Sequence, residues 1–582
     1  MKKQKFLILP VAIMTLAMFA AKPSSVLPQI THTQKDELTR VFLTPTRVVW
    51  SNPTQNIQNM ECLLKPGDGQ SSFYNKDICK ITNRGITSFI LDFGKEIHGG
   101  LQFVTGLCNH NTVNIRIRFG ESVSECNSDV NKSNGNASAN DFAIRDREFS
   151  LPHHGTAELG NVGFRFVRID VLDSNSTVQL KEVRAIMRYR DIPYLGSFHC
   201  SDARLDSIWM VGAYTTHLNM QEYLWDGIKR DRTIWVGDMH PEIATITSVF
   251  GPNPIVERTL SKVIEQYPLP HWVNNYSSYS MWYLIILHDW YMYSGDKNYL
   301  LENKQYLDSL IKQISEHIHD DGSEDLATKR FLDWPSSSNK EGVESGYRAL
   351  LSLALTDAEK IARFMDDAEM ASTAIKARER LNKVIKAPAG QEQAAAVMAL
   401  AGTMDAKEAC SKYIDEKGIS NFTSFFGYYF LKVLAMNNEY QQAMDYIKAF
   451  WGGMLDLGAT TFWEDFNVSW ENNAARIDEL VPEGKVDVHA TYGKYCYSGF
   501  RCSYCHGWAS GPTPWLTQYV LGVNIASPGC RKLIITPHLG NLTFAEGTFP
   551  TPLGIVKIKH VKSVLGKITT TVSAPKGIKI IK

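Results

Sequence analysis

The sequence lacks an excess of charge of either sign. Its 582 residues include 61 Lys and Arg and 61 Asp and Glu, so the formal net charge is +0 at pH 7. A nucleic-acid partner or an anionic membrane surface is usually bound through a basic excess. We therefore expect no nucleic-acid partner. The 44% hydrophobic and 21% charged content is that of a globular protein with room for several domains.

Cysteine is also scarce, because ten cysteines in 582 residues are far below the density of a disulfide-stapled scaffold. Cys502, Cys505 and His506 form C-S-Y-C-H, which has the spacing of a c-type haem attachment site. Nothing else in the sequence indicates a haem domain, and a second C-x-x-C pair that would complete a zinc site is missing. We interpret the two cysteines as free thiols or a local disulfide.

Long apolar runs are missing after the first 21 residues. Lys2, Lys3 and Lys5 precede an apolar run, Phe6 to Ala21, that ends in small residues. This is the pattern of a secretory signal peptide, and the run is shorter than the ~20 residues of a membrane span. We predict a signal peptide at 1–22 and an exported, periplasmic or extracellular mature chain without a membrane span. A single membrane anchor is the alternative.

Three regimes of periodicity divide the rest of the chain. Residues from about Leu38 to Arg190 alternate and are rich in β-formers, which predicts an antiparallel β-sandwich domain at 35–195. The polar segment Cys126 to Asp141 is predicted to be a surface loop. From about Ser527 the β pattern returns, and we predict a small β domain at 526–582 that docks on the middle region.

The middle region, 196–525, has helical periodicity with short breaks. Acidic and aromatic residues at several breaks favour a helical toroid of paired helices, and a plain bundle is the alternative because both bury one face of each helix. The predicted helices are Ser201–Tyr223, Pro241–Phe250, Pro254–Gln266, Ser277–Ser294, Asn298–His317, Ser345–Arg363, Asp367–Val384, Gln391–Leu400, Ala406–Ile414, Asn421–Met436, Glu439–Phe450 and Gly507–Leu521.

Three clusters in this region combine acids or a histidine with tryptophan. They read D-G-I-K-R-D-R-T-I-W-V-G-D from Asp226, G-A-T-T-F-W-E-D from Gly458, and C-H-G-W-A-S-G-P-T-P-W-L from Cys505. Carboxylates and imidazole can hydrogen-bond hydroxyls and protonate a leaving oxygen, while indole stacks on the apolar face of a pyranose. The clusters therefore predict a sugar site.

The order of domains and these three motifs resemble the bacterial α-L-rhamnosidases of glycoside hydrolase family 78, from roughly Leu91 to the C-terminus. Shorter matches are L-D-F-G-K-E-I-H-G-G from Leu91, I-R-F-G-E-S-V-S-E from Ile117, F-R-F-V-R-I-D from Phe164 and I-T-P-H-L-G-N-L from Ile535. The resemblance implies an (α/α)6 toroid of the six-hairpin glycosidase type. It also implies hydrolysis of terminal α-L-rhamnosyl groups, or a related deoxysugar, with inversion.

The resemblance also implies roles for individual residues. Asp226, Arg232, Trp235 and Asp238 match the sugar-binding positions of the first motif. Asp231 stands where the family has a glutamate as general acid, and Glu242 is the nearest substitute. Glu464 matches the general base. His506 and Trp508 match the family's sugar-contacting segment. Independently of the resemblance, Asp333 and Trp334 in F-L-D-W-P and Trp463 in its acidic cluster are further expected sugar contacts.

An inverting glycosidase needs a protonated carboxylic acid and an ionised carboxylate about 6.5–9.5 Å apart. Burial or a neighbouring carboxylate such as Asp226 or Asp238 would keep Asp231 protonated. Lys229, Arg230 and Arg232 would lower its pKa, so we expect them to turn partly outward or to pair with other acids.

Two other functions stay open. One is a carbohydrate-binding protein without hydrolytic activity, and the other is a polysaccharide lyase, which needs a base and positive charge at a uronate. Lys229 and Arg230 in the pit in place of Asp231 would favour the lyase. We predict no required cofactor because two carboxylates need only water. The aglycone, structural calcium and the oligomeric state are left open.

Overall fold

A computed structural model describes residues 38–581 of the chain, except 72, 75, 130–144, 327–328 and 494–496. The predicted signal peptide lies outside the described residues, and so does most of the predicted polar loop after Cys126. Within the part of the chain that is described, no helix is both long and apolar enough to cross a bilayer.

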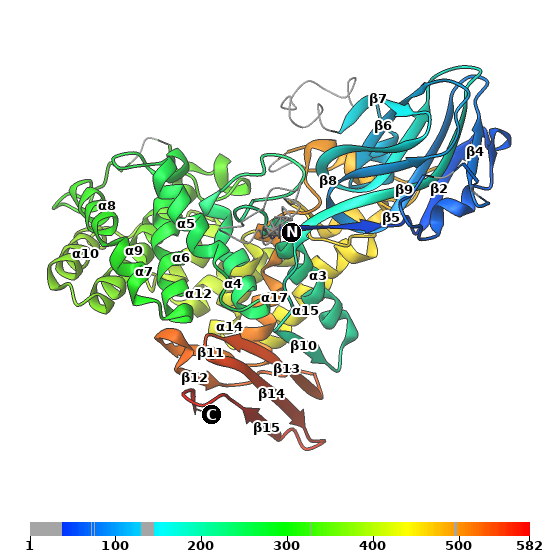
Figure 1. Ribbon diagram of the computed structural model, residues 1–582. Coiled ribbons are helices and arrows are strands. Elements are labelled where there is room, and N and C mark those ends of the chain that lie inside the picture. The colour runs from blue at the N-terminus through cyan, green and yellow to red at the C-terminus, as the bar shows by residue number, and fades with distance from the viewer. Residues whose placement is uncertain are drawn as a thin grey trace, which may run out of the picture. The chain divides into compact units, whose positions relative to one another are not determined.

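The N-terminal region is antiparallel β structure, as predicted (Figure 1). Its long central strand β5 pairs along one side with β8, and along the other side first with β2 and then with β9. This change of partner lets the sheet fold over its own core, so almost every residue of β5 is buried. The strands are β1 Leu38–Leu43, β2 Arg47–Asn52, β3 Ile57–Gln58, β4 Cys79–Thr82, β5 Thr87–Thr105, β6 Thr112–Gly120, β7 Asp146–Pro152, β8 Gly155–Val171 and β9 Thr177–Arg190, and helix α1 (Val123–Asn127) follows β6.

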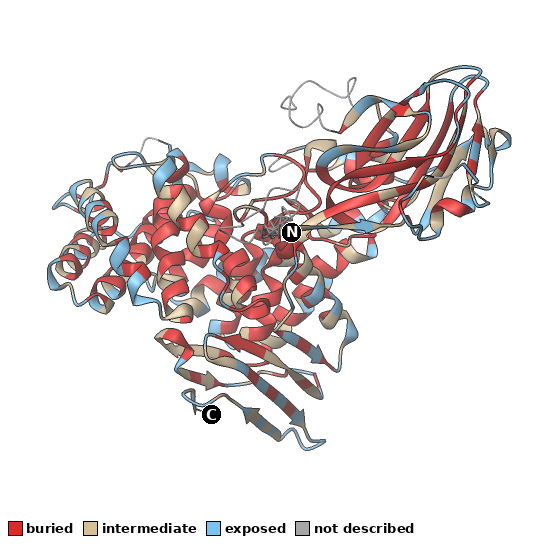
Figure 2. Cartoon of the chain, in the orientation of Figure 1, coloured by how far each residue is buried: buried red, intermediate tan, exposed pale blue. Residues whose placement is uncertain are grey.

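The middle region is helical, as predicted. Helices α6, α11 and α14 are buried on nearly all sides, whereas α8 and α10 bury one stripe and expose the other (Figure 2). That contrast is expected when inner helices are ringed by outer ones. The helices are α3 Ala203–Asn219, α4 Met239–Val249, α5 Ile255–Gln266, α6 Ser277–Ser294, α7 Lys297–Glu302, α8 Lys304–Glu316, α9 Lys340–Phe364, α10 Ala368–Leu381, α11 Glu392–Leu400, α12 Ala406–Ala409, α13 Asp415–Lys417, α14 Gly427–Met436, α15 Tyr440–Asp456, α16 Val488–Thr491 and α17 Pro512–Trp515.

Several predicted helices differ from the observed ones at their ends. Ser277–Ser294 matches α6, which ends at Gly295 in the left-handed conformation. The predicted helix Asn298–His317 is divided at Asn303 into α7 and α8. The predicted helix Gly507–Leu521 is three short pieces, a 3₁₀ turn, α17 and a π turn, because Pro512 and Pro514 cannot donate the bonds of a regular helix.

Two small sheets form the C-terminal β structure. One contains β11 Val523–Ser527, β12 Lys532–Ile535 and β16 Lys579–Ile581, and the other contains β13 Phe544–Thr551, β14 Gly554–Lys562 and β15 Ile568–Ser573. The second sheet also takes in β10, Ser197–Cys200, which precedes the first helix of the middle region and pairs with β13. Side chains such as Leu533, Phe549 and Ile558 belong to the same buried cluster as the helices. The C-terminal sheets therefore share their core with the helical region.

Candidate active site

Backbone hydrogen bonds bring the three sequence clusters together. Gly227 forms a β-bridge with His506, and the Gly507 amide donates to the Asp226 carbonyl at 2.8 Å. The His506 amide in turn donates to the Phe462 carbonyl at 3.0 Å. A Cβ at position 227 would lie only 2.9 Å from the Cys505 carbonyl oxygen, so glycine permits this close approach. Residues more than 230 positions apart thus become neighbours.

The loop that follows α3 is closed on itself and strained at its tip. The Asp226 amide donates to the Thr233 carbonyl at 3.1 Å, and the Thr233 amide donates back to Asp226 Oδ1 at 3.1 Å. At the tip, Asp231 and Arg232 both have left-handed backbones, with φ of 51° and 53°. Such a conformation costs a non-glycine residue roughly 1–2 kcal/mol.

A cavity of about 150 Å³ lies where the clusters meet. It is smaller than the ~300–1,000 Å³ of pockets that hold drug-sized ligands, so it fits one monosaccharide unit. Carboxylates, an arginine, a histidine and many aromatic rings form its wall. The lining residues are Asp226, Arg230, Asp231, Trp235, Asp238, Tyr276, Tyr279, Phe331, Trp334, Glu464, Tyr497, His506 and Trp508.

Glu464 is buried in the cavity wall and held at both carboxylate oxygens. Its Oε1 accepts a short hydrogen bond from Arg230 Nη2, and its Oε2 accepts from the Ser503 amide at 2.9 Å. Burial raises the pKa of this carboxyl, but the positive charges of Arg230 and His506 outweigh burial and hold the pKa below its usual value. Glu464 is therefore ionised at neutral pH.

Asp226 has the opposite proton state. Burial, with a smaller contribution from the nearby carboxylates of Asp231 and Asp238, raises the pKa of Asp226 to about 8, although His506 opposes the rise. Burial also raises the pKa of Asp238, against a hydrogen bond from His506 at 3.3 Å. The pKa of His506 is raised in turn, because attraction to Glu464 and Asp238 exceeds the burial penalty. The cavity therefore contains both ionised and protonated carboxyls.

Arg230 lies between the two expected catalytic carboxylates. Its Nη1 is 3.5 Å from Asp231 Oδ2, while its Nη2 bonds Glu464. The Arg501 carbonyl accepts from Nε at 2.9 Å, and the guanidinium lies 3.9 Å above the Tyr497 ring. Lys229 and Arg230 pair with acids other than Asp231, as expected. Neither turns outward, because both are buried, and Arg230 also lies against Asp231. The Asp231 side chain is 31% exposed, at the rim of the cavity.

Eight of the residues expected from the sequence line this cavity, and three do not. Arg232 points away and donates to the Asn161 carbonyl of the N-terminal sheet at 2.6 Å. Asp333 is buried behind the wall, where the Trp334 amide donates to it at 2.8 Å. Trp463 is a core residue stacked on Tyr504 at 4.0 Å. The eight are Asp226, Asp231, Trp235, Asp238, Trp334, Glu464, His506 and Trp508.

Glu242, the substitute acid considered above, also lies outside the cavity wall. It is fully buried beneath Gly507, and Asn219 donates to its Oε1 at 3.1 Å. Burial raises the pKa of Glu242 well above its usual value. Glu242 is therefore a neutral internal acid and does not face the cavity.

Sequence reasoning missed Arg230 as a cavity residue, and it also missed the rings of Tyr276, Tyr279, Phe331 and Tyr497. Tyr276 and Tyr279 are three positions apart at the start of α6, a spacing that puts both on one face of a helix. Phe331 precedes the Asp333–Trp334 pair that was singled out. These were usable signals, whereas Tyr497 lies in a stretch without helical or strand periodicity.

The two cysteines of C-S-Y-C-H are buried free thiols. Burial raises the pKa of both Cys502 and Cys505 well above the usual value. All nine cysteines in the described part of the chain are free. This answers the question left open by the sequence in favour of free thiols.

Solved structures of rhamnosidases resemble this fold. The GH78 rhamnosidase of Bacillus sp. GL1 matches with a TM-score of 0.70 and 21% identity over 89% of this chain and 55% of its own. The rhamnosidase of Klebsiella oxytoca, solved with rhamnose bound, matches with a TM-score of 0.61 and 20% identity over 82% of this chain and 95% of its own.

An α-L-rhamnosidase of Alteromonas sp. (strain LOR) is 30% identical over 110 residues, 19% of this chain and 10% of that protein. The chain thus spans little more than half of the Bacillus protein and a tenth of the Alteromonas one. The family described as bacterial α-L-rhamnosidase six-hairpin glycosidase domain matches residues 193–520. The chain belongs to this family of bacterial α-L-rhamnosidase six-hairpin glycosidases.

Proposed function

We propose that this protein is a glycoside hydrolase that releases terminal α-L-rhamnose, or a related deoxysugar, from glycans or glycosides with inversion. The observation that carries the proposal is the position of Asp231 and Glu464 on either side of Arg230, around a cavity the size of one sugar. Family membership supports the choice of sugar, as does the rhamnose bound in the Klebsiella structure.

In this proposal Glu464 is the general base. It is ionised at neutral pH because Arg230 and His506 hold its pKa low, which is the state needed to take a proton from the attacking water. The Ser503 amide fixes the direction of the carboxylate. Water deprotonated by Glu464 attacks the anomeric carbon from the face opposite the leaving group, which inverts the configuration.

Asp231 is the proposed general acid. It lies at the partly exposed rim of the cavity, where the aglycone of a sugar bound inside would leave. Asp226 and Asp238 line the same cavity.

The remaining wall suits a deoxysugar. Trp235, Trp334 and Trp508 offer indole faces on which a pyranose can stack. Tyr276, Tyr279 and Phe331 add an aromatic surface that can accept the methyl group of a 6-deoxyhexose. His506 and Asp238 provide polar atoms that can bind sugar hydroxyls.

The roles are tested with aryl α-L-rhamnosides that differ only in leaving group. Asp231→Asn is expected to lower kcat about 10²–10⁴-fold with a poor leaving group, and to lose much less with a dinitrophenolate, which departs without a proton. Glu464→Gln is expected to lose similar activity with both substrates. Asp289→Asn, outside the cavity, serves as the control. Equal losses with both leaving groups for Asp231→Asn would remove the acid role from that residue.

A carbohydrate-binding protein without hydrolysis is the second candidate. Both oxygens of Glu464 are already engaged, by Arg230 and by the Ser503 amide, and this could leave the carboxylate unable to activate water. Binding of L-rhamnose in calorimetry without turnover of any aryl rhamnoside would establish this function. A lyase is less well supported: Arg230 lines the cavity, but it does so beside Asp231 rather than in its place, and Lys229 does not line it.

We further propose that the mature protein is exported and needs no cofactor. The charged and apolar N-terminal pattern supports export, and two carboxylates suffice for the chemistry. Activity is expected to be unchanged after dialysis against a metal chelator, because no step of the proposed chemistry uses a metal ion. A loss of activity that added calcium restores would contradict the proposal that no cofactor is needed.

A further inference from the structure

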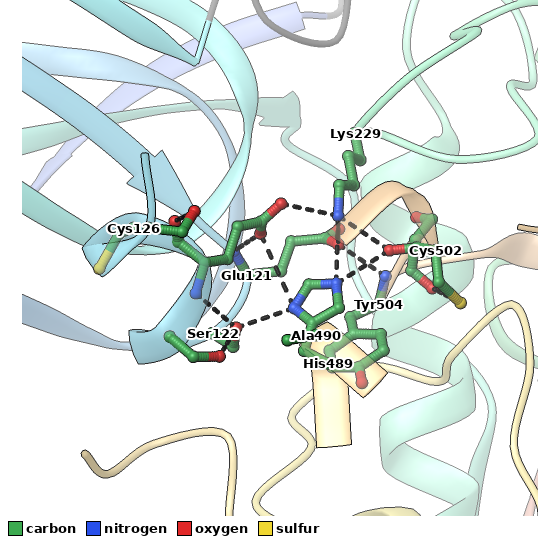
Figure 3. Close-up of polar contacts among 12 residues, drawn as sticks. Glu121, Ser122, Cys126, Lys229, His489, Ala490, Cys502 and Tyr504 are labelled. Carbon is green, nitrogen blue, oxygen red and sulfur yellow. Dashed lines mark hydrogen bonds and ion pairs between the residues drawn. The ribbon is translucent and has the colours of Figure 1, made fainter. Parts of the chain in front are cut away.

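A buried ionic cluster joins the N-terminal sheet region to the loop from Asp226 to Thr233, which carries the proposed general acid (Figure 3). Lys229 Nζ lies 3.2 Å from Glu121 Oε2 and 2.8 Å from Glu125 Oε1, and it donates to the Cys502 carbonyl at 2.8 Å. His489 of α16 lies beside it, with Nε2 3.2 Å from Nζ. Glu121 and Glu125 come from I-R-F-G-E-S-V-S-E, a motif to which the proposed chemistry gives no role.

The cation of this cluster belongs to the protein. Glu121, Glu125 and His489 are placed closely enough to hold a metal ion, but the Lys229 ammonium lies within 3.2 Å of an atom of each. Arg145 contacts Glu125 as a second cation. Glu121 and Glu125 thus face two cations, while burial raises the pKa of the neighbouring Glu96 well above its usual value. All of these side chains are buried, so the cluster is compensated without a bound ion.

Glu121 reaches both backbone segments that hold Glu464. The same oxygen that faces Lys229 also accepts from the Tyr504 amide at 2.7 Å. Lys229 precedes Arg230, which bonds Oε1 of Glu464, and Tyr504 follows Ser503, whose amide bonds Oε2. One carboxylate of the N-terminal sheet region therefore ties together the neighbours of both groups that hold the general base.

Stacked aromatic rings form a second connection between the Glu121 region and Glu464. The His489 ring stacks on Tyr504 at 3.9 Å, and Tyr504 stacks on Trp463 at 4.0 Å. Trp463 is the residue before Glu464. Ser122, next to Glu121, lies 2.8 Å from His489 Nδ1. Both the ionic contacts and the stacked rings thus end at the residues around Glu464.

We propose that Glu121 is a positioning residue for catalysis, which makes the N-terminal domain a working part of the active site. The inference rests on the proposed function of Glu464 as general base. By fixing Lys229 and the Tyr504 amide, Glu121 keeps Arg230 and the Ser503 amide on the two oxygens of Glu464. Loss of these contacts releases the Arg230 guanidinium from Glu464. The pKa of Glu464 then rises, and the proposed base is less ionised.

The sign of the expected pH effect separates positioning from simple charge removal. Groups facing Glu464 are Arg230 and His506, which lower its pKa, and the acids Asp231, Asp238 and Tyr497 with the Cys502 thiol, which surround it. Groups facing Glu121 are Lys229, Arg145, Glu96 and Glu125. Removing the Glu121 charge through space would lower the pKa of Glu464, whereas loss of the Arg230 contact would raise it.

The test compares Glu121→Gln with wild type across pH, using an aryl α-L-rhamnoside. Glu121→Gln is expected to lower kcat about 10–100-fold with little change in KM, as misplacement of a catalytic group does. The acidic limb of kcat/KM is expected to move to higher pH. Glu121→Asp, which keeps the charge on a shorter arm, should shift the limb in the same direction by less, and it remains informative if the glutamine variant fails to fold.

Glu182→Gln is the matched control, because Glu182 is a buried glutamate of the same sheet that accepts from the Gly69 amide, away from the cluster. It should leave the pH profile unchanged. The proposal would be overturned if the acidic limb of kcat/KM stayed at the same pH, or moved to lower pH, in both Glu121 variants.

A readout independent of hydrolysis keeps this test separate from the proposed function. Hydrogen–deuterium exchange at the amides of Ser503 and Tyr504 is expected to rise at least about tenfold in Glu121→Gln, which corresponds to ~1.4 kcal/mol of lost protection, and to stay unchanged in Glu182→Gln. Wild-type protein without rhamnosidase activity would refute the function, while unchanged exchange in Glu121→Gln would refute the positioning role.

Discussion

At the scale of single residues, the cavity separates its carboxyls by their surroundings. Glu464 stays ionised because Arg230 and His506 face it, whereas Asp226 stays protonated at neutral pH because burial dominates. The two groups have the same chemistry and differ only in their neighbours. The same cavity wall therefore contains an ionised and a protonated carboxyl at neutral pH.

Asp226 gives a prediction for alkaline pH. Its pKa of about 8 means that it ionises as the pH rises through 8 and adds a negative charge to the cavity. We expect kcat/KM of the wild type to fall about tenfold per pH unit above that point, and Asp226→Asn to lack this limb. The measurement is the pH profile of kcat/KM for both proteins, and an identical basic limb in the variant would assign it to another group.

The same carboxyl affects stability with a definite sign. The folded-state pKa of Asp226 is raised from 3.8 to about 8. Its contribution to the free energy of unfolding is therefore fully present below pH ~4 and is lost as the pH rises through 8. The unfolding midpoint of wild type is therefore expected to fall relative to Asp226→Asn between about pH 5 and pH 9. Differential scanning fluorimetry at matched ionic strength measures this difference, and a constant difference would contradict the raised pKa.

Side-chain direction limited what the sequence could predict at this scale. The three clusters identified seven residues of the cavity wall, because acids and tryptophans gather there, and the Asp333–Trp334 pair supplied Trp334 as the eighth. Arg232 was expected in the site because it matches the first motif, and Trp463 because it lies in an acidic cluster, yet Arg232 contacts the N-terminal sheet and Trp463 packs in the core. Arg232 follows the left-handed Asp231, and a backbone reversal of this kind cannot be read from residue types.

At the scale of structural elements, strand β8 supports the loop from Asp226 to Thr233, which carries the proposed general acid. The Gly163 amide donates to the Ile228 carbonyl at 2.9 Å. A Cβ at position 163 would lie 2.7 Å from the Ile228 side chain and 3.0 Å from its carbonyl carbon. The absence of a side chain at position 163 thus permits this close hydrogen bond between the N-terminal sheet and the loop.

Gly163→Ala is expected to push the loop away from the sheet. We predict a loss of about tenfold or more in kcat, since a shift near 1 Å in a catalytic group has costs up to 10²-fold. Gly85→Ala is the control, because a Cβ there meets nothing within 4 Å. Steady-state kinetics and the unfolding midpoint of both variants provide the comparison, and equal kcat in the two would show that the loop does not depend on this contact.

Helix prediction succeeded where periodicity was long and failed where short-range chemistry decided. The limits of α6 were predicted from its apolar run and the glycine after it. The division at Asn303 and the broken segment after Gly507 were missed, because one capping residue and two prolines override the pattern. The sequence from Val468 to Arg501 has no helical or strand periodicity, so the way in which this segment folds could not be predicted.

At the scale of the whole molecule, one small sheet combines strands from both sides of the helical region. Strand β10 precedes α3 and pairs with β13, more than 340 residues later. The buried cluster of the helical region continues into Leu533, Phe549 and Ile558 of the C-terminal sheets. Domain limits predicted from composition could not show this exchange, because β10 is only four residues long.

Removal of the C-terminal sheets is therefore expected to unfold the helical region. A chain ending at Leu521 would expose the apolar surface now covered by those strands and leave β10 without a partner. We predict that most of the truncated protein is insoluble, and that the full chain shows one calorimetric transition for both parts. A soluble truncated protein with a transition of its own would show that the two cores are independent.

The central claim is inversion by Asp231 and Glu464, and proton NMR of a hydrolysing aryl α-L-rhamnoside tests it most directly. The account predicts that β-L-rhamnose appears first and mutarotates later, and that Asp231→Asn and Glu464→Gln each slow its release by about 10²-fold or more. Initial release of α-L-rhamnose, or undiminished release by either variant, would contradict it.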